Sequence, residues 1–200
     1  LDGRMIFNGA IFRSEYDDKQ ESILIPVNLS NVATVVRNAS SLEMTGLELE
    51  VKYQISQAWD LMATYGYLNS EYDNYLADLT GDGIVTDNSD LVPRNTPENT
   101  FGLTTSYTTQ IGNGDLKARI SYRFRDSMET ESQNNPLGSL DSIHNVNANI
   151  NYTISNYSVS VWGRNITDER EERWSTIGGL TSRGWWNEPA TYGVTLSASF

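Results

Sequence analysis

The chain has 200 residues, with 14 lysines and arginines against 26 aspartates and glutamates, and a formal net charge of −12. This balance argues against a nucleic-acid partner, because phosphate binding needs a basic surface. The sequence has no cysteine, so no disulfide stabilises it. It also has no run of about 18 apolar residues, the length that a membrane-spanning helix needs. A membrane role would therefore depend on strands.

Alternating apolar and polar residues dominate the chain, and they predict β-strands rather than helices. The first predicted strand, Arg4–Tyr16, has apolar residues on both faces, so its facing stays open. Six later strands alternate over about ten residues, the length of a tilted strand that crosses a bilayer. Tyr157–Ile166 is also predicted as a strand, although Trp162 falls on its polar face. The apolar faces of the six begin with Leu47, Leu61, Phe101, Leu116, Val146 and Tyr192.

The connections alternate between short and long. Short turns are predicted at Ser56–Ala58, Gly112–Asp115 and Ser155–Asn156. The long polar connections are Ile23–Ala39, Asn74–Glu98, Glu131–Leu140 and Arg170–Glu188. Short periplasmic turns and long extracellular loops are typical of outer-membrane β-barrels, whereas soluble sandwiches lack this regularity. We therefore expect an all-β, antiparallel transmembrane barrel segment of about eight strands, with Phe200 at the periplasmic side.

Aromatic residues support this orientation, because interfacial girdles lie one strand length apart. One group lies near the short turns and another near the long loops. The first contains Tyr53, Trp59, Tyr152, Tyr157 and Phe200, and the second contains Tyr67, Phe101, Phe124 and Tyr192.

Several segments resemble, in order and spacing, the C-terminal barrel of TonB-dependent outer-membrane receptors. They include the alternating Glu48 and Glu50 after Gly46, and the aromatic end of the chain. The segments are Ala10–Asp18, Thr45–Glu50, Tyr65–Tyr72, Val92–Pro97, Asn165–Glu169 and Pro189–Phe200.

The resemblance implies that residues 1–200 are the C-terminal portion of a barrel of about 22 strands, with the plug and earlier strands absent. It implies TonB-coupled uptake of a scarce, bulky nutrient such as an iron–siderophore complex. Further implied partners are outer-membrane lipid, the TonB complex, and the barrel-assembly machinery, which would read the C-terminal strand. The alternative is a small, complete eight-stranded barrel with a structural or adhesion role, which would require its first and last strands to pair.

The segment Asp78–Asp90 resembles a calcium loop. Oxygen ligands at alternate positions followed by a glycine, here Gly83, suit a hard cation. Ser89 stands where a bidentate acid is expected, and a solvated turn is the competing interpretation. Calcium is the only cofactor that the sequence suggests, and its expected ligands are Asp78, Thr80, Asp82, Asp87 and Asp90.

Two sets of residues are candidates for binding a ligand. The first is a basic stripe on the lumen face of one strand, which would either attract an anion or pair with carboxylates such as Glu48 and Glu50. The second is a group of aromatic and cationic residues in the last long connection, which would either contact a ligand or pack within the loop. The stripe is Lys117, Arg119, Arg123 and Arg125, and the loop group is Arg173, Trp174, Arg183, Trp185 and Trp186.

No enzyme is expected. His144 is the only histidine, and it has no cysteine or second histidine to form a zinc site or a Cys–His pair. A barrel-embedded hydrolase would need clustered catalytic side chains, which this sequence does not offer. We expect that the segment alone cannot transport, and that its long loops contribute to the capture of ligand.

Overall fold

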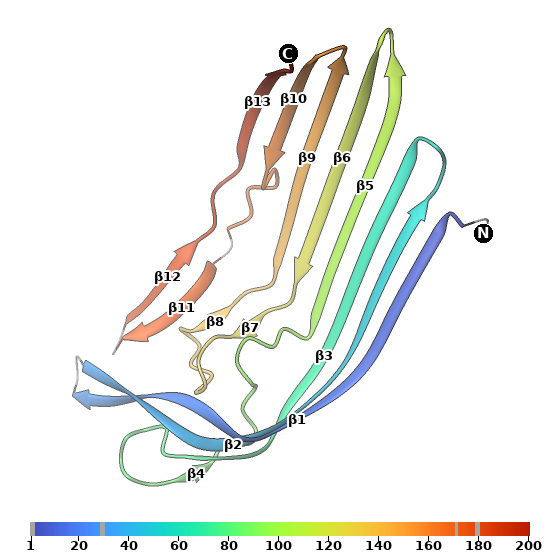
Figure 1. Cartoon of the computed structure of the whole chain (residues 1–200). Helices are drawn as coiled ribbons and strands as arrows, with labels where there is room; N and C mark the ends of the chain where they lie inside the picture. The colour runs from blue at the N-terminus through green and yellow to red at the C-terminus, as the bar shows by residue number, and fades with distance from the viewer. Residues whose placement is uncertain (1–2, 29–30, 171, 179–180) are drawn as a thin grey trace.

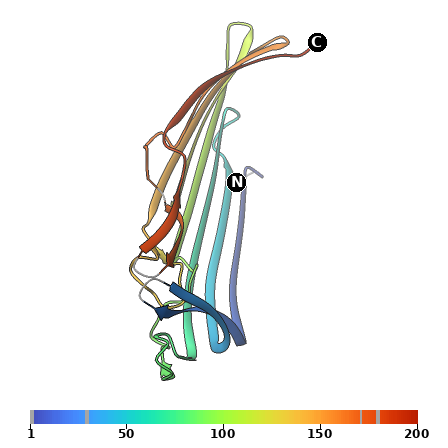
Figure 2. The ribbon, with the colours of Figure 1, turned by 90° about the vertical axis from the view of Figure 1, so that its left-hand side faces the viewer.

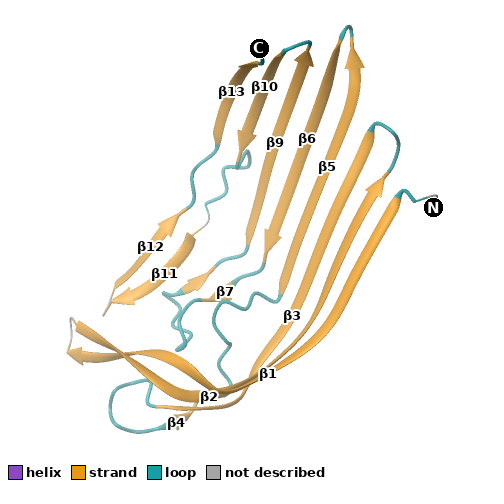
Figure 3. Ribbon diagram, in the orientation of Figure 1, coloured by secondary structure: helices purple, strands orange, loops and turns teal. Residues whose placement is uncertain are grey.

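The computed structural model describes residues 3–28, 31–170, 172–178 and 181–200. Eight strands follow one antiparallel path in the order β1-β2-β3-β5-β6-β9-β10-β13, which confirms the predicted number of wall strands. Figures 1 and 3 show them as one curved sheet without helices. Their bounds are β1 Met5–Asn28, β2 Asn31–Gln54, β3 Trp59–Ala77, β5 Asn99–Ile111, β6 Gly114–Arg125, β9 Ile143–Ile154, β10 Tyr157–Arg164 and β13 Thr191–Ala198.

No helix that is long and apolar enough to cross a bilayer occurs among the residues that the structure describes.

One register places the alternating apolar residues of all eight strands on the same face, with exceptions such as Ile6, Phe12 and Trp162, because residues directly opposite in an antiparallel ladder share a face. In β6 and its neighbours, Ile120 lies opposite Thr105 and Ala148. The register also resolves the facing of the first strand: Phe7 lies opposite Val51, and Ile11 lies opposite Leu47. The odd-numbered residues of β1 from Met5 to Ile11 therefore belong to the apolar face.

The apolar face is strongly exposed in this structure. Ile11 is 86% exposed and Leu196 is 74% exposed, at opposite ends of the strand path. Soluble proteins rarely expose a continuous apolar surface of this size. The register of alternating lipid-facing and lumen-facing residues is the one expected for a barrel wall.

Trp162 lies on the polar face because a glycine makes room for it. Gly193 lies opposite Trp162, and a Cβ atom there would come within 2.3 Å of the indole ring. The indole Nε1 donates a hydrogen bond to Thr195 Oγ1 at 3.1 Å. Phe12 covers Gly46 in the same way near the other edge of the sheet. A large aromatic ring thus fits against the polar side of the wall without breaking the alternation.

The long-loop end contains more regular structure than the sequence indicates. The prediction that Ile23–Ala39 is a polar connection was wrong, since β1 and β2 continue as one long hairpin to Asn28 and Asn31. This hairpin bends away from the wall (Figure 1). Beyond the expected membrane span no face would meet lipid, so the alternation that is typical of a wall strand is not required there. Shorter elements also form here: β4 Thr86–Asp87, β7 Met128–Glu129, β8 Ser139–Leu140, β11 Glu172–Gly178 and β12 Thr181–Trp186.

The buried apolar core lies in this long-loop layer and not in the wall. Its central residues come from the distal parts of β1, β2 and β3, and Leu79 and Leu91 of the following connection pack against them. The core residues are Ile23, Leu42, Tyr72, Tyr75 and Ala77. The core thereby holds the β1–β2 hairpin against the neighbouring loop.

Strands β1 and β13 lie at the two edges of the strand path, and the ladders of the described residues do not pair them. Figure 2 shows the thin, curved sheet from its side, with β11 and β12 standing off it. A complete eight-stranded barrel requires a β1–β13 ladder. The structure therefore does not support the small-barrel alternative.

Candidate functional site

The polar face of the wall combines a row of cations on β6 with a row of asparagines on β9. The four residues of the predicted basic stripe occupy odd-numbered positions of β6 and therefore share one face of the sheet. Arg123 lies opposite Asn145, Arg119 opposite Asn149, and Lys117 opposite Asn151. Guanidinium and amide groups together can bind anionic and polar oxygen atoms.

The long-loop end of this face forms a hollow of about 570 Å³. The wall supplies two guanidinium groups and two amides, and the returning end of the last loop supplies an indole. Its lining residues are Arg123, Asn145, Asn147, Arg164, Asn165, Trp186, Asn187, Glu188 and Pro189. Trp186 remains 61% exposed, so its ring is accessible to a ligand.

A chain of amide hydrogen bonds links the wall side of the hollow to the residue that follows β10. Asn147 Nδ2 donates to Asn145 Oδ1 at 3.0 Å, and Asn145 Nδ2 donates to Asn165 Oδ1 at 3.3 Å. The backbone amide of Asn165 donates to Asn147 Oδ1 at 2.9 Å. These bonds hold the amide groups in fixed orientations beside Arg123.

The structure brings together only part of the two predicted ligand-binding sets. Arg123 and Trp186 line the same hollow, whereas Trp185 does not line it. Arg125 instead donates to the carbonyl oxygens of Asp126 and Asp141, at 2.8 and 3.2 Å. The side chains of Arg173, Trp174 and Arg183 lie outside the described part of the structure.

Seven of the nine lining residues were not expected at a binding site: Asn145, Asn147, Arg164, Asn165, Asn187, Glu188 and Pro189. The asparagine alternation on β9 was a visible signal of a polar face. Nothing local in the sequence shows that Arg164, at the end of β10, joins Arg123 of β6.

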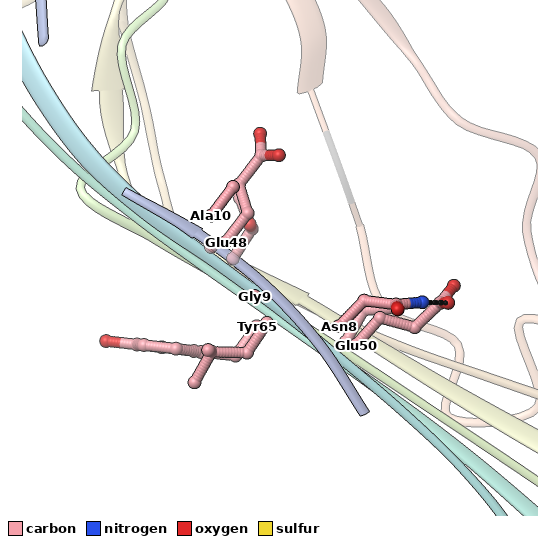
Figure 4. A pocket seen from close by; sticks show the side chains of 10 residues that line it. Asn8, Gly9, Ala10, Glu48, Glu50 and Tyr65 are labelled. Atoms are coloured by element: carbon pink, nitrogen blue, oxygen red, sulfur yellow. Dashed lines mark hydrogen bonds between the residues drawn. The ribbon is translucent and has the colours of Figure 1, made fainter. Parts of the chain in front are cut away.

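A second hollow, of about 490 Å³, lies over β1, β2 and β3. In Figure 4, Asn8, Glu48 and Glu50 project from one side of the sheet and Tyr65 from the other. Asn8 Nδ2 donates to Glu50 Oε1 at 2.9 Å, and Lys52 Nζ lies 3.1 Å from the same oxygen. Glu50 thus pairs within its own region, and the polar face is acidic on β2 and basic on β6.

In the long-loop layer, Glu21 is fully buried and receives donors from its own strand and from three other segments. Tyr72 OH donates to Oε1 at 2.9 Å, and Ser132 Oγ donates to Oε2 at 2.7 Å. Lys19 Nζ contacts Oε1, and Arg94 Nε lies 3.5 Å from Oε2. A buried carboxylate is stable only with such partners. Glu21 therefore joins β1, β3 and two loops.

The surroundings of Glu21 shift the pKa of several groups in this layer. Burial by itself raises the pKa of Glu21, but donors from Lys19, Ser132 and Tyr72 bring that pKa below its ordinary value. Burial, together with the charge of Glu21, raises the pKa of Tyr75 to about 12. The cluster thus favours an ionised Glu21 beside a neutral Tyr75.

The Asp78–Asp90 loop is held by hydrogen bonds within the turn. Asp78 accepts backbone amides of Thr80, Gly81 and Gly83 at 2.7 to 3.1 Å. Asp82 Oδ1 accepts the amide of Ile84, and Asp87 Oδ1 accepts that of Ser89. Within the described ranges, no three His, Asp or Glu side chains are grouped to hold a metal. Calcium binding stays a prediction, and it would have to compete with these amides.

The single register, exposed apolar face and alternating short turns and long loops define a class: the wall of an outer-membrane β-barrel. The family model for the TonB-dependent receptor-like β-barrel matches residues 1–166. The chain belongs to this family, and its location is the bacterial outer membrane. The family is made up of transport receptors.

Solved structures show the same fold. The ferric yersiniabactin uptake receptor FyuA from Yersinia pestis matches with a TM-score of 0.76 and 17% identity, over 99% of this chain and 28% of that one. The siderophore receptor PiuA from Acinetobacter baumannii matches with a TM-score of 0.72 and 21% identity, over 99% and 26%. The ferric-catecholate import receptor Fiu from E. coli K12 matches with a TM-score of 0.70 and 20% identity, over 100% and 26%. The chain thus spans about a quarter of their length.

Proposed function

We propose that this chain is the C-terminal part of a receptor barrel that imports a negatively charged ferric chelate across the outer membrane. The family membership and the siderophore receptors of the same fold support an uptake role. The negative charge proposed for the ligand rests on the hollow at the extracellular end, which Arg123 and Arg164 line together with asparagine amides and Trp186. Guanidinium groups bind anionic oxygen atoms well, and an indole ring suits a flat or bulky chelate.

Energy and assembly would come from partners outside these 200 residues. Coupling to the TonB complex is proposed through a plug domain, as in the family. The terminal strand, which runs from Thr191 and is followed by Phe200, is proposed as the signal for the barrel-assembly machinery. The exposed apolar face of Ile11, Ile120 and Leu196 is proposed to contact lipid.

The two arginines of the hollow provide a direct test. Replacing both Arg123 and Arg164 by Gln in the assembled receptor should weaken binding of an anionic ferric chelate about tenfold, or about 1.4 kcal/mol. The probes are ferric citrate and ferric tris-dihydroxybenzoate, with a neutral ferric trihydroxamate for comparison. Affinity is measured by equilibrium titration in detergent.

Lys117→Gln is the matched control. Lys117 lies on the same face of β6, farther from the long loops than Arg123, and it does not line the hollow. This variant should stay within about twofold of the unsubstituted receptor, because an exposed, distant charge contributes little. Equal weakening by both changes would show a general charge effect rather than a site. Unchanged affinity in the double variant would show that the hollow does not bind the ligand.

A further inference from the structure

Asn165 lies at the base of the last extracellular loop, where the outgoing chain after β10 and the returning chain before β13 meet; we call this place the neck of the loop. It directly follows β10, is only 5% exposed, and has a backbone φ of 49°. Asparagine tolerates this left-handed conformation better than most residues. The loop that leaves here carries β11 and β12 and returns through Trp186 to β13.

The side-chain amide of Asn165 connects both ends of this loop to the wall. Its Nδ2 donates to the carbonyl oxygens of Glu169 and Glu188, at 2.9 and 3.1 Å. Its Oδ1 accepts the backbone amide of Glu169 at 3.0 Å and Asn145 Nδ2 at 3.3 Å. A carboxamide has two donors and two acceptor lone pairs, so all four are used.

Neighbouring bonds close the neck further. Asn187 Nδ2 donates to the Glu169 carbonyl at 3.0 Å, and the amide of Ala190 donates to Asp168 Oδ1 at 2.8 Å. On the wall side, the amide of Ile166 donates to the Val146 carbonyl at 2.9 Å. Among these groups, the Asn165 amide is the one that bonds outgoing chain, returning chain and β9 together.

We propose that Asn165 is the positioning residue of the ligand hollow. By fixing Glu188 relative to Asn145, its amide holds the adjoining Trp186 and Asn187 above Arg123 and Arg164. The consequence for binding rests on the proposed function, but the position of the loop base does not.

The test uses variants that keep the backbone geometry. Asn165→Asp has nearly the same shape and tolerates a positive φ, yet it replaces the two donors by acceptors that face carbonyl oxygens. Asn165→Gly keeps the φ and removes the amide. Asn134→Asp is the matched control: Asn134 has a φ of 48°, and its amide similarly donates to the carbonyl oxygens of Val92 and Glu131, which belong to two other long connections.

The position of the loop base is read without ligand. These 200 residues contain no cysteine, so spin labels can be placed through Trp185→Cys in the loop and Asn156→Cys in the β9–β10 turn. Double electron–electron resonance on the assembled receptor should give one narrow distance distribution. Both Asn165 variants should broaden it, whereas Asn134→Asp should not. An unchanged distribution in correctly assembled Asn165→Asp and Asn165→Gly, or equal broadening in Asn134→Asp, would overturn the proposal.

Affinity for ferric citrate is measured in parallel on receptors without labels. Both Asn165 variants should lose about tenfold, the factor expected if one loop in ten stays in place. A broadened distribution with unchanged affinity would overturn the role of Asn165 in binding. If the unsubstituted receptor binds no ferric chelate at all, the proposed function fails, and the distance measurement alone decides whether Asn165 positions the loop.

Discussion

In the wall, large apolar side chains such as Ile11 and Leu196 are exposed, whereas Ile23 and Tyr75 of the extracellular layer are almost completely buried. The wall has backbone ladders and an apolar face that lipid can cover. The extracellular layer has water around it, so it needs a core of its own and satisfied polar groups such as Glu21. The wall is therefore stabilised in lipid and the extracellular layer in water, and strands β1, β2 and β3 extend through both.

The largest expected effect is a loss of stability in the extracellular layer, with the stability of the wall unchanged. Glu21→Ala removes the shared partner of Tyr72, Ser132 and Lys19, and should destabilise the layer by roughly 3–5 kcal/mol, as expected for a broken buried ionic network. Hydrogen exchange measured by mass spectrometry should show lost protection in the distal β1–β2 hairpin. Protection in the part of the ladder around Leu49 should persist.

Glu43→Ala is the control on the same hairpin. Glu43 pairs with the exposed Arg13 at 2.8 Å, and such surface pairs contribute about 0–1 kcal/mol. Lowering the pH offers a second measurement of the stabilisation that Glu21 contributes. Because the folded pKa of Glu21 lies below 4.5, its stabilisation is present above pH 4.5 and is lost as the pH falls through the folded value. Equal loss of protection in both variants would contradict the special role of Glu21.

The next effect sharpens the assignment of the wall faces. Ile120→Arg and Leu196→Arg place a charge on the lipid face near mid-membrane and should each cost roughly 2–4 kcal/mol. Arg119→Gln changes the neighbouring, polar-face position and should cost far less. Refolding into lipid vesicles, followed by denaturant titration, measures the differences. Equal losses on both faces would contradict the register.

The smallest effect concerns the calcium prediction. If Asp78, Asp82, Asp87 and Asp90 bind calcium with a dissociation constant of about 1 mM, 10 mM calcium should stabilise the loop by about 1.4 kcal/mol. Calorimetric titration of the assembled receptor should show saturable binding that Asp82→Asn weakens. Asp115→Asn, at the start of β6 at the opposite end of the sheet, should leave the titration unchanged. If binding does not saturate at millimolar calcium, the calcium prediction is wrong. The loop is then a turn held only by hydrogen bonds from its own backbone amides.

The wall could be predicted from sequence because lipid and lumen impose a period of two on each strand, as around Leu47 and Ile120. The facing of β1 could not, since Ile6 and Phe7 are both apolar, and only pairing with Lys52 and Val51 separates them. The Glu21 cluster has no local signal in the sequence, because Tyr72 and Ser132 lie 51 and 111 positions away from Glu21. Of the nine residues that line the hollow, the sequence pattern singled out only Arg123 and Trp186, because the partners of Asn165 are brought together only by the fold.

The bond between Ser132 and Glu21 has a consequence for the order of folding, because it joins residues 111 positions apart. Contacts of such long sequence separation form late, after the intervening chain has been brought into place. Pairing of the strands from β1 to β6 shortens the loop that separates Ser132 from the carboxylate, so we expect this bond to form after them. During insertion the β1–β2 hairpin would be open to proteases, and its resistance to cleavage would report the moment at which the neighbouring wall is complete.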